Sequence, residues 1–182
     1  MFDHVVEGMF QRALGKRLPS TAREELKRAG LDLDRPLRPA YPLADYFRFL
    51  EIAGRALYPT LTVPQAMFEL GTCFLDGYLD TLMGKAIINL ARLLGPARAL
   101  RRSSRTWRQG NNFTEVEVIE RDARTFELRF NLVGPYAEHT QGALTGALRI
   151  NEGLDVKVEI IGREGQGATY LVTWNDKGDR DR

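Results

Sequence analysis

Cysteine and histidine are scarce in this chain of 182 residues, which contains only Cys73, His4 and His139 of these two types. A single cysteine excludes an internal disulfide and a zinc site made of several cysteines. A metal site would therefore have to consist mostly of carboxylates, and no carboxylates have a spacing that indicates one. We predict neither a metal site nor a cofactor.

Long apolar runs are also absent. The longest stretch without a charged residue covers residues 56–68 and contains two prolines, so it is too short and too interrupted to span a bilayer. The first residues, Met1 to His4, carry an acid early and lack the basic start and apolar middle of a secretory signal. We expect a cytoplasmic protein without a membrane span.

Charge is nearly balanced over the whole chain but is unevenly distributed. Residues 1–111 hold 17 Lys or Arg against 11 Asp or Glu, whereas residues 112–182 hold 9 against 13. A basic half of this kind occurs in proteins that bind nucleic acid, phosphate or membrane surfaces, and it also arises from ordinary solvated side chains. Charge therefore leaves a basic binding face open without requiring one.

Apolar residues recur at intervals of three and four in the first 111 residues, which is typical of amphipathic helices. Capping boxes at Thr21 with Glu24 and at Thr62 with Gln65 mark two helix starts, because each pair of side chains satisfies exposed backbone amides. Gly95, followed by a proline, marks a helix end. The pattern predicts helices over residues 2–14, 22–29, 43–57, 63–78 and 79–94.

After residue 112 the apolar period changes to two, which indicates half-buried strands. Residues 114–119 and 126–132 form one expected hairpin, and residues 155–160 and 170–174 form another. Between them, residues 136–150 form a helix on which Gly142 and Gly146 allow close packing. We predict an α+β fold in which N-terminal helices pack with a four-stranded antiparallel sheet in ββαββ order. One domain would span residues 1–174, and the polar residues 175–182 would form a disordered tail.

The C-terminal pattern of small and apolar residues resembles a known superfamily. It is carried by the runs Gly142-Ala143-Leu144-Thr145-Gly146-Ala147-Leu148, Gly153-Leu154-Asp155-Val156-Lys157-Val158-Glu159 and Ala168-Thr169-Tyr170-Leu171-Val172-Thr173-Trp174. The superfamily unites haem-nitric-oxide-binding domains, the 4-vinyl-reductase-like small-molecule-binding domain and a subunit group of the TRAPP vesicle-tethering complex. Residues 1–174 also resemble an uncharacterised myxobacterial family in the same neighbourhood. The resemblance implies a fold and a pocket and names no ligand.

Two branches of this superfamily have features that the chain lacks. Haem-binding members use a helical histidine below the iron and a Tyr-x-Ser-x-Arg triplet for the propionates. No tyrosine here has that spacing, and neither His4 nor His139 matches the ligand position. The 4-vinyl-reductase-like members commonly carry cysteines in the last hairpin, where residues 160–170 have none. The resemblance therefore implies neither haem nor a bound metal.

Apolarity and the resemblance together indicate a pocket between the helices of residues 62–94 and the C-terminal sheet. Some vesicle-tethering relatives carry a fatty-acylated cysteine on such a helix, whereas an isolated cysteine on an apolar helix is most often a small buried hydrophobe. Both interpretations apply to Cys73. The residues expected to line or gate the pocket are Phe68, Cys73, Phe74, Met83, Phe130 and Tyr136.

A run of arginines is the most distinctive polar feature, comprising Arg98, Arg101, Arg102, Arg105 and Arg108. On a helix these offsets would present several guanidinium groups on one side, and each group can donate two hydrogen bonds to a phosphate. The Arg-x-x-x-Arg spacing of residues 101–105 also occurs in PilZ-type cyclic-di-GMP receptors, whose second element is absent downstream. The run indicates either an anion-binding site or a solvated basic face.

No set of residues in the sequence indicates a reaction, so we predict no catalytic residues. The glycine-rich segment 162–167 lies between two expected strands, whereas a phosphate-cradling loop joins a strand to a helix. We predict a non-enzymatic sensory or regulatory module that binds a small or lipid-like apolar molecule. The alternatives are a homodimeric protein-interaction adaptor and a phosphate, nucleotide or nucleic-acid binder that uses the arginine run.

Overall fold

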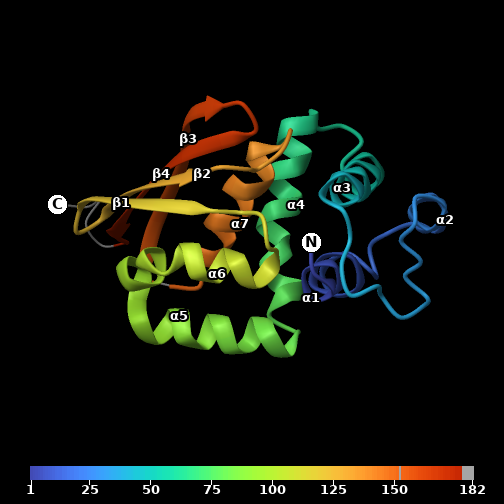
Figure 1. Cartoon of the computed structure of the whole chain (residues 1–182), viewed down its shortest axis with the longest axis horizontal. Coiled ribbons are helices and arrows are strands. Elements are labelled where there is room, and N and C mark those ends of the chain that lie inside the picture. The colour runs from blue at the N-terminus through green and yellow to red at the C-terminus, as the bar shows by residue number, and fades with distance from the viewer. Residues whose placement is uncertain (152, 178–182) are drawn as a thin grey trace.

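The computed structural model describes residues 1–151 and 153–177, and within α5 it leaves out the side chains of residues 83, 87, 88 and 90–92. A helical N-terminal half is followed by strands and one helix in ββαββ order (Figure 1), which confirms the predicted α+β fold. The helices are α1 (Asp3–Val6), the π-helical segment η1 (Glu7–Ala13), α2 (Ser20–Arg28), α3 (Leu43–Leu57), α4 (Val63–Tyr78), α5 (Leu82–Arg101), α6 (Ser103–Gly110) and α7 (Ala137–Arg149). The strands are β1 (Val116–Asp122), β2 (Thr125–Phe130), β3 (Leu154–Glu164) and β4 (Gly167–Asp176).

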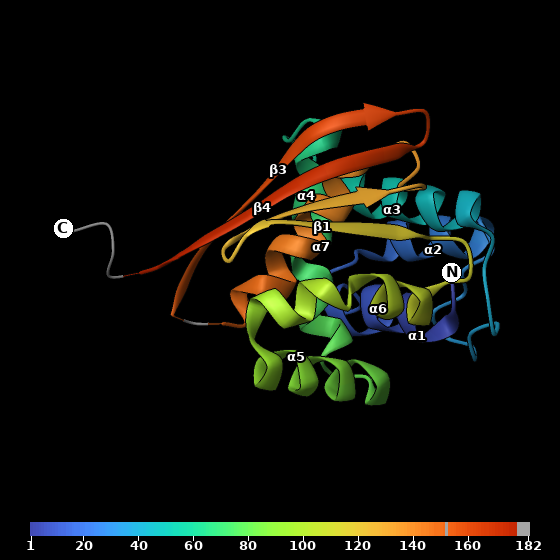
Figure 2. The ribbon, with the colours of Figure 1, turned by 60° about the vertical axis from the view of Figure 1, so that its left-hand side comes forward.

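The four strands form one antiparallel sheet in the order β1-β2-β4-β3 (Figure 2). The two predicted hairpins join through β2 and β4, where Phe126 pairs with Val172 and Leu128 pairs with Tyr170. These four side chains are fully buried. The alternation that predicted the strands therefore arises because one face of the sheet packs against the helices.

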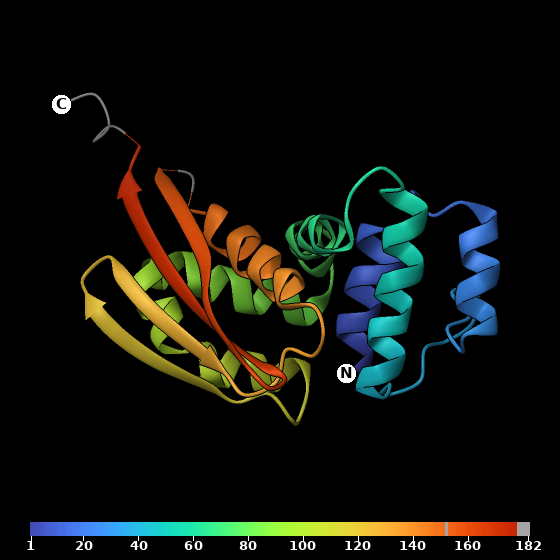
Figure 3. The same cartoon turned by 90° about the horizontal axis from the view of Figure 1, so that it is seen from above.

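Two hydrophobic cores lie on opposite sides of α4, which Figure 3 shows end-on between the sheet and the N-terminal helices. One core joins α1, η1, α2 and α3, and the other joins the sheet to α7. Helices α4 and α7 cross closely because glycines face the contact. A Cβ on Gly142 would overlap the carbonyl oxygen of Phe68, and a Cβ on Gly71 would overlap that of His139. The predicted close packing at Gly142 is confirmed.

One of the two predicted capping boxes is present. The backbone N–H of Thr62 donates to Oε1 of Gln65 at 3.0 Å, and α4 begins at the next residue. The prediction at Thr21 is wrong, because α2 begins at Ser20, two residues before the predicted start, and its first turn closes on the carbonyl of Pro19. That carbonyl accepts hydrogen bonds from the N–H groups of Ala22 and Arg23.

The predicted helix end at Gly95 is confirmed, although the label α5 also includes a second helical segment beyond it. Gly95 has non-helical backbone angles, with φ 72° and ψ 169°, and helical structure resumes at Pro96 and continues to Arg101. The helix lies at the edge of the molecule (Figure 2), and its Leu82 and Leu93 are 90% and 84% exposed. No helix in the described part of the chain is long and apolar enough to cross a membrane.

The predicted tail begins later than residue 175. Asn175 and Asp176 belong to β4, where they pair with Asp155 and Leu154 of β3. Pairing with β3 therefore extends β4 by two polar residues beyond Trp174, the last buried residue of the strand. Residues 178–182 of the predicted tail lie outside the described residues.

Candidate ligand-binding cavity

A cavity of about 420 Å³ lies where α4, α7 and the sheet face α5 and α6. Small-molecule sites in proteins commonly have volumes of this order and mostly apolar walls. Helices α3 to α7 and strand β2 all contribute to the wall, so it touches both hydrophobic cores. Its apolar lining includes Val5, Leu43, Phe47, Phe74, Leu75, Leu94, Leu100, Phe130, Leu144 and Leu148.

Helix α7 leaves room for the cavity by placing small residues on the side that faces it. Ala143 and Ala147 are one turn apart and line the cavity, as do their larger neighbours Leu144 and Leu148. On another face of the same helix, Gly142 allows contact with α4. One helix thus carries two rows of small residues, one for close packing and one that borders empty space.

Aromatic side chains from α3, α4 and α7 form one end of the cavity. The rings of Tyr46 and His139 meet edge to face with centroids 6.0 Å apart, and those of Phe74 and Tyr78 stack at 5.0 Å. Burial raises the pKa of Tyr78 to about 12 and also raises the pKa of Tyr46. Both phenols are therefore neutral at pH 7.

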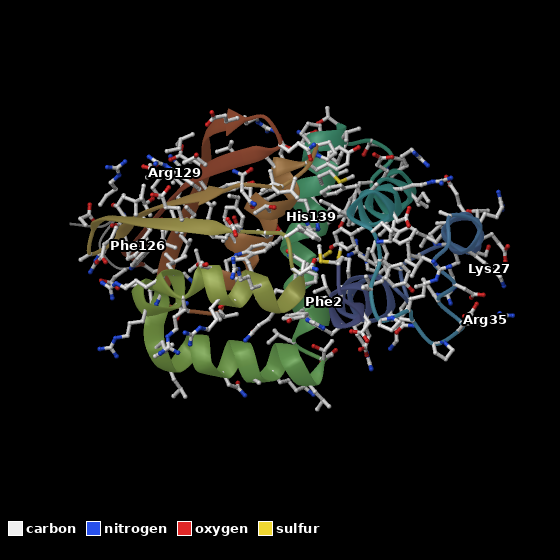
Figure 4. All side chains as sticks on the ribbon, in the orientation of Figure 1. Phe2, Lys27, Arg35, Phe126, Arg129 and His139 are labelled. Carbon is white, nitrogen blue, oxygen red and sulfur yellow. The ribbon has the colours of Figure 1, made fainter. Side chains whose placement is uncertain are left out.

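His139 lies at the junction of α4 and α7, near the centre of Figure 4, and lines the cavity. Burial lowers its pKa to about 4, so the imidazole is neutral at pH 7. Its Nε2 is enclosed by protein and has no hydrogen-bond partner in the described part of the chain. A buried polar atom without a partner is costly and uncommon, and it draws attention to this end of the cavity.

The rim of the cavity on α6 is polar and basic. Arg102 and Arg105 line it and are exposed, and beside them lies the buried Ser103. Within the described residues, neither arginine has a carboxylate partner. The cavity thus joins an apolar interior to a positively charged mouth.

The arginine run that the sequence singles out is divided by the structure. Arg101 donates to both carboxylate oxygens of Glu120, at 2.8 and 2.6 Å, and Arg108 donates to Glu115 at 2.9 Å. Arg98 is exposed on α5 and does not line the cavity. Because the helix breaks at Arg102, the five side chains do not share one face, and only Arg102 and Arg105 reach the rim.

The predicted pocket residues are also divided. Phe74 and Phe130 line the cavity. Phe68, Cys73 and Tyr136 do not, and the side chain of Met83 lies outside the described residues. The prediction used apolarity and the resemblance alone, neither of which shows which side of a helix faces a cavity.

Cys73 and Tyr136 have local partners instead. The thiol of Cys73 donates to the carbonyl oxygen of Leu70 at 3.3 Å, and burial raises its pKa. The hydroxyl of Tyr136 is hydrogen-bonded to Glu51 of α3, and burial together with that carboxylate raises the pKa of Tyr136 to about 12. Cys73 is therefore a partly buried thiol in the N-terminal core, and Tyr136 ties the start of α7 to α3.

Sequence reasoning missed several lining residues, notably Tyr46, Tyr78, Ala143, Ala147 and the cavity position of His139. A signal for part of this set is present in the sequence. His139, Ala143 and Ala147 recur every four residues, which places them on one side of α7, and alanines in such a row indicate either a close neighbour or a space.

Comparisons with known proteins bear on the family and the fold. The family described as "Protein of unknown function (DUF2378)" matches residues 1–175. No curated protein is similar enough in sequence to match the chain. Solved structures of H-NOX proteins match over nearly the whole chain, at identities that establish similarity of fold alone.

Three of these structures illustrate the range. A doubly substituted variant of Tt H-NOX has a TM-score of 0.74 at 13% identity and covers 98% of this chain and 96% of its own. An oxygen complex of an oxygen-binding H-NOX domain related to soluble guanylate cyclases has a TM-score of 0.70 at 14% identity, with coverage of 98% and 96%. An H-NOX protein from S. oneidensis in the Fe(II)NO state has a TM-score of 0.69 at 9% identity, with coverage of 97% and 100%.

The fold thus raises the question of whether the cavity suits haem, and its donor atoms do not. Haem iron in proteins takes an axial His, Cys, Met or Tyr ligand. Residues 82–110, which form the α5 and α6 wall, contain no histidine, cysteine or tyrosine, and the side chain of their one methionine, Met83, lies outside the described residues. Nε2 of His139 is enclosed by protein, and the raised pKa values of Tyr46 and Tyr78 disfavour the phenolate that iron would bind. Met1 also lines the cavity, but methionine serves as a haem ligand together with histidine, and no accessible histidine nitrogen is present among the described lining residues. The described residues therefore do not fit haem.

Proposed function

The chain belongs to the DUF2378 family, described as proteins of unknown function, and we propose that it is a non-enzymatic sensory module that binds a small apolar or lipid-like molecule. The observation that carries this proposal is the apolar cavity between α4, α7, the sheet, α5 and α6. A ligand with an apolar surface would displace water from this lining and bury apolar area on both sides of the contact, which favours binding there.

Binding rather than catalysis is favoured by the ionisable groups near the cavity. Burial keeps the thiol of Cys73 protonated, and a protonated thiol is a poor nucleophile. His139 is neutral but has an enclosed Nε2, so a substrate in the cavity cannot reach that nitrogen directly. These groups do not form a nucleophile with an adjacent base.

The position of the cavity wall supports a sensory role. Helices α5 and α6 contribute Ala86, Leu94 and Trp107 to the cavity, and α5 also carries the exposed Leu82 and Leu93. A ligand that contacts the inner side of α5 would stabilise one position of a helix whose outer side is free to meet a partner. Such differential stabilisation is the requirement for a ligand to shift a conformational equilibrium.

The test is a fluorescence titration with Nile red, a neutral apolar probe. We expect the wild type to bind it at one saturable site and Ala147→Phe to lose that site, because the new ring fills the cavity. Ala123→Phe, in the exposed β1–β2 turn, is the matched control and should bind as the wild type does. Absence of saturable binding to the wild type, or equal binding to folded Ala147→Phe, would overturn the proposal.

The exposed leucines of α5 favour a second candidate, a homodimer formed with another copy of this chain. Leu82 and Leu93 are eleven residues apart and therefore lie on one side of the helix. Large exposed apolar side chains on one helix face often mark a protein contact. Light scattering after size exclusion should give a dimer for the wild type and a monomer for Leu82→Ser with Leu93→Ser. A monomeric wild type at high concentration would contradict this candidate.

A further inference from the structure

We propose that the ligand of the cavity is a single-chain anionic amphiphile, with its headgroup between Arg102 and Arg105 and its hydrocarbon chain in the apolar interior. This inference rests on the proposed function and specifies the chemistry of the ligand. It combines the charge of the rim with the apolarity of the wall behind it. A long-chain carboxylate is the simplest molecule with both properties.

The charge of the lining is of one sign. Among the described residues that line the cavity there is no aspartate, glutamate or lysine, and the only charged side chains at pH 7 are Arg102 and Arg105. Met1, whose ammonium group donates to the carbonyl oxygen of Tyr41 at 2.6 Å, also lines it. A cationic ligand would find no counter-charge among these residues, whereas an anion would meet two guanidinium groups.

The two rim arginines differ from their neighbours in the same run. Arg101 and Arg108 are neutralised by Glu120 and Glu115 of the β1 region. Arg102, at the break before α6, and Arg105, in the first turn of α6, lie three residues apart, and neither has a carboxylate partner in the described part of the chain. Two like charges so close in the chain repel each other, and an anion bound to both would relieve the repulsion.

Away from the rim the lining is mostly apolar, with Leu100, Leu144 and Leu148 among its residues, and its polar members, such as Asn111 and Thr140, are uncharged. No other charged side chain lines the cavity among the described residues. A nucleotide would bring ribose hydroxyls and base edges against this apolar surface and would leave many of them without partners. A hydrocarbon chain loses nothing there and gains about fourfold in affinity for each methylene that it buries.

Isothermal titration of the delipidated full chain with micromolar dodecanoate tests this assignment. Dodecyl phosphate is the second anionic arm, dodecanol the neutral arm, and butanoate the short-chain arm. We expect both twelve-carbon anions to bind at a ratio of one to one, dodecanol to bind at least tenfold more weakly, and butanoate to show no detectable binding. The tighter of the two anions identifies the headgroup.

Charge variants localise the headgroup. Arg102→Gln with Arg105→Gln should weaken dodecanoate binding at least tenfold and leave dodecanol unchanged. The matched control, Arg28→Gln with Arg48→Gln, removes the same charge from exposed positions on α2 and α3 and should behave as the wild type. Addition of ATP should not displace dodecanoate.

The contrary outcomes are distinct. Equal affinity for dodecanol and dodecanoate, or unchanged dodecanoate binding in Arg102→Gln with Arg105→Gln, would overturn the headgroup assignment while Nile red still binds and the proposed function stands. If neither the anionic probes nor Nile red bind, the proposed function itself fails. Displacement of dodecanoate by ATP would overturn the amphiphile assignment in favour of a nucleotide.

Discussion

Arg101 and Arg102 are neighbours in the chain, but they serve different parts of the molecule. The guanidinium of Arg101 donates to both oxygens of Glu120 and lies 5.8 Å from the ring centre of Phe126, so it binds the end of α5 to the sheet. Arg102 lines the cavity and, within the described residues, has no carboxylate partner. The break between α5 and α6 falls at Arg102, so the two residues do not belong to one continuous helix.

The glycine contact between α4 and α7 should be sensitive to one added methyl group. Gly142→Ala would force its Cβ into the backbone of Phe68, which cannot move without separating the two helices. We expect a loss of about 3 kcal/mol or more in the free energy of unfolding, measured by urea denaturation. Gly153→Ala, whose Cβ would meet no atom within 4 Å, should change stability by less than about 0.5 kcal/mol. Equal stability of the two variants would contradict the packing account.

The close packing of Gly142 could be predicted from sequence, whereas the cavity could not, and the reason is physical. Sequence patterns predict helices and strands correctly because capping and apolar alternation depend on residues that are close together in the chain. Gln65 caps α4, and Phe126 and Leu128 alternate with charged residues because one sheet face is buried. A cavity depends on which sides of separate helices face one another. Tyr136, for example, is bonded to Glu51, which is 85 positions away in the chain.

The sequence also could not show which arginines line the rim of the cavity. The run of five arginines is plain in the sequence, but its division depends on carboxylates of the β1 region that neutralise two of them. A helix break at Arg102 then determines which of the rest reach the cavity. Neither fact follows from the spacing of the arginines alone.

Burial of His139 should make stability fall as the pH falls. Its pKa is about 4 in the folded state and near 6.5 when unfolded, so between these values the unfolded state binds more protons. Stability is therefore complete above about pH 6.5 and is lost progressively toward pH 4. The loss between pH 7.5 and pH 5 should be about 2 kcal/mol.

The control for this pH dependence is His139→Phe, which keeps an aromatic ring and removes the titrating group. Hydrogen bonds from Arg121 and Arg129 lower the pKa of Glu127, so this carboxylate also makes stability depend on pH. Because it is present in both proteins, its contribution cancels when the two pH dependences are compared. Urea denaturation at pH 5 and pH 7.5 should show a smaller difference for the variant. The same difference in both proteins would rule out His139 as its source.

Haemin should not form an axially ligated complex with this chain. The α5 and α6 wall has no His, Cys or Tyr, and His139 keeps Nε2 enclosed. Absorption spectra of a haemin titration should therefore lack a Soret band of a protein-coordinated iron. A Soret band of coordinated iron that disappears in His139→Ala would show that His139 does bind haem iron, contrary to this expectation.

Cys73 should be dispensable for binding. Its thiol is bonded to the carbonyl oxygen of Leu70 and does not line the cavity, and burial raises its pKa. We expect Cys73→Ala to bind Nile red with wild-type affinity and the wild-type thiol to react with iodoacetamide more slowly than free cysteine at pH 7.5. A large loss of binding in a folded Cys73→Ala variant would show that the cavity wall includes this residue.

The most direct test of the central claim, that the apolar cavity holds a ligand, is a crystal structure of the chain soaked with 12-bromododecanoate, analysed by the anomalous signal of bromine. We expect one bromine peak inside the cavity, among side chains such as Phe74 and Leu144, with the carboxylate at Arg102 and Arg105. A cavity filled by protein side chains, with bromine absent from it, would show that no ligand of this kind binds there.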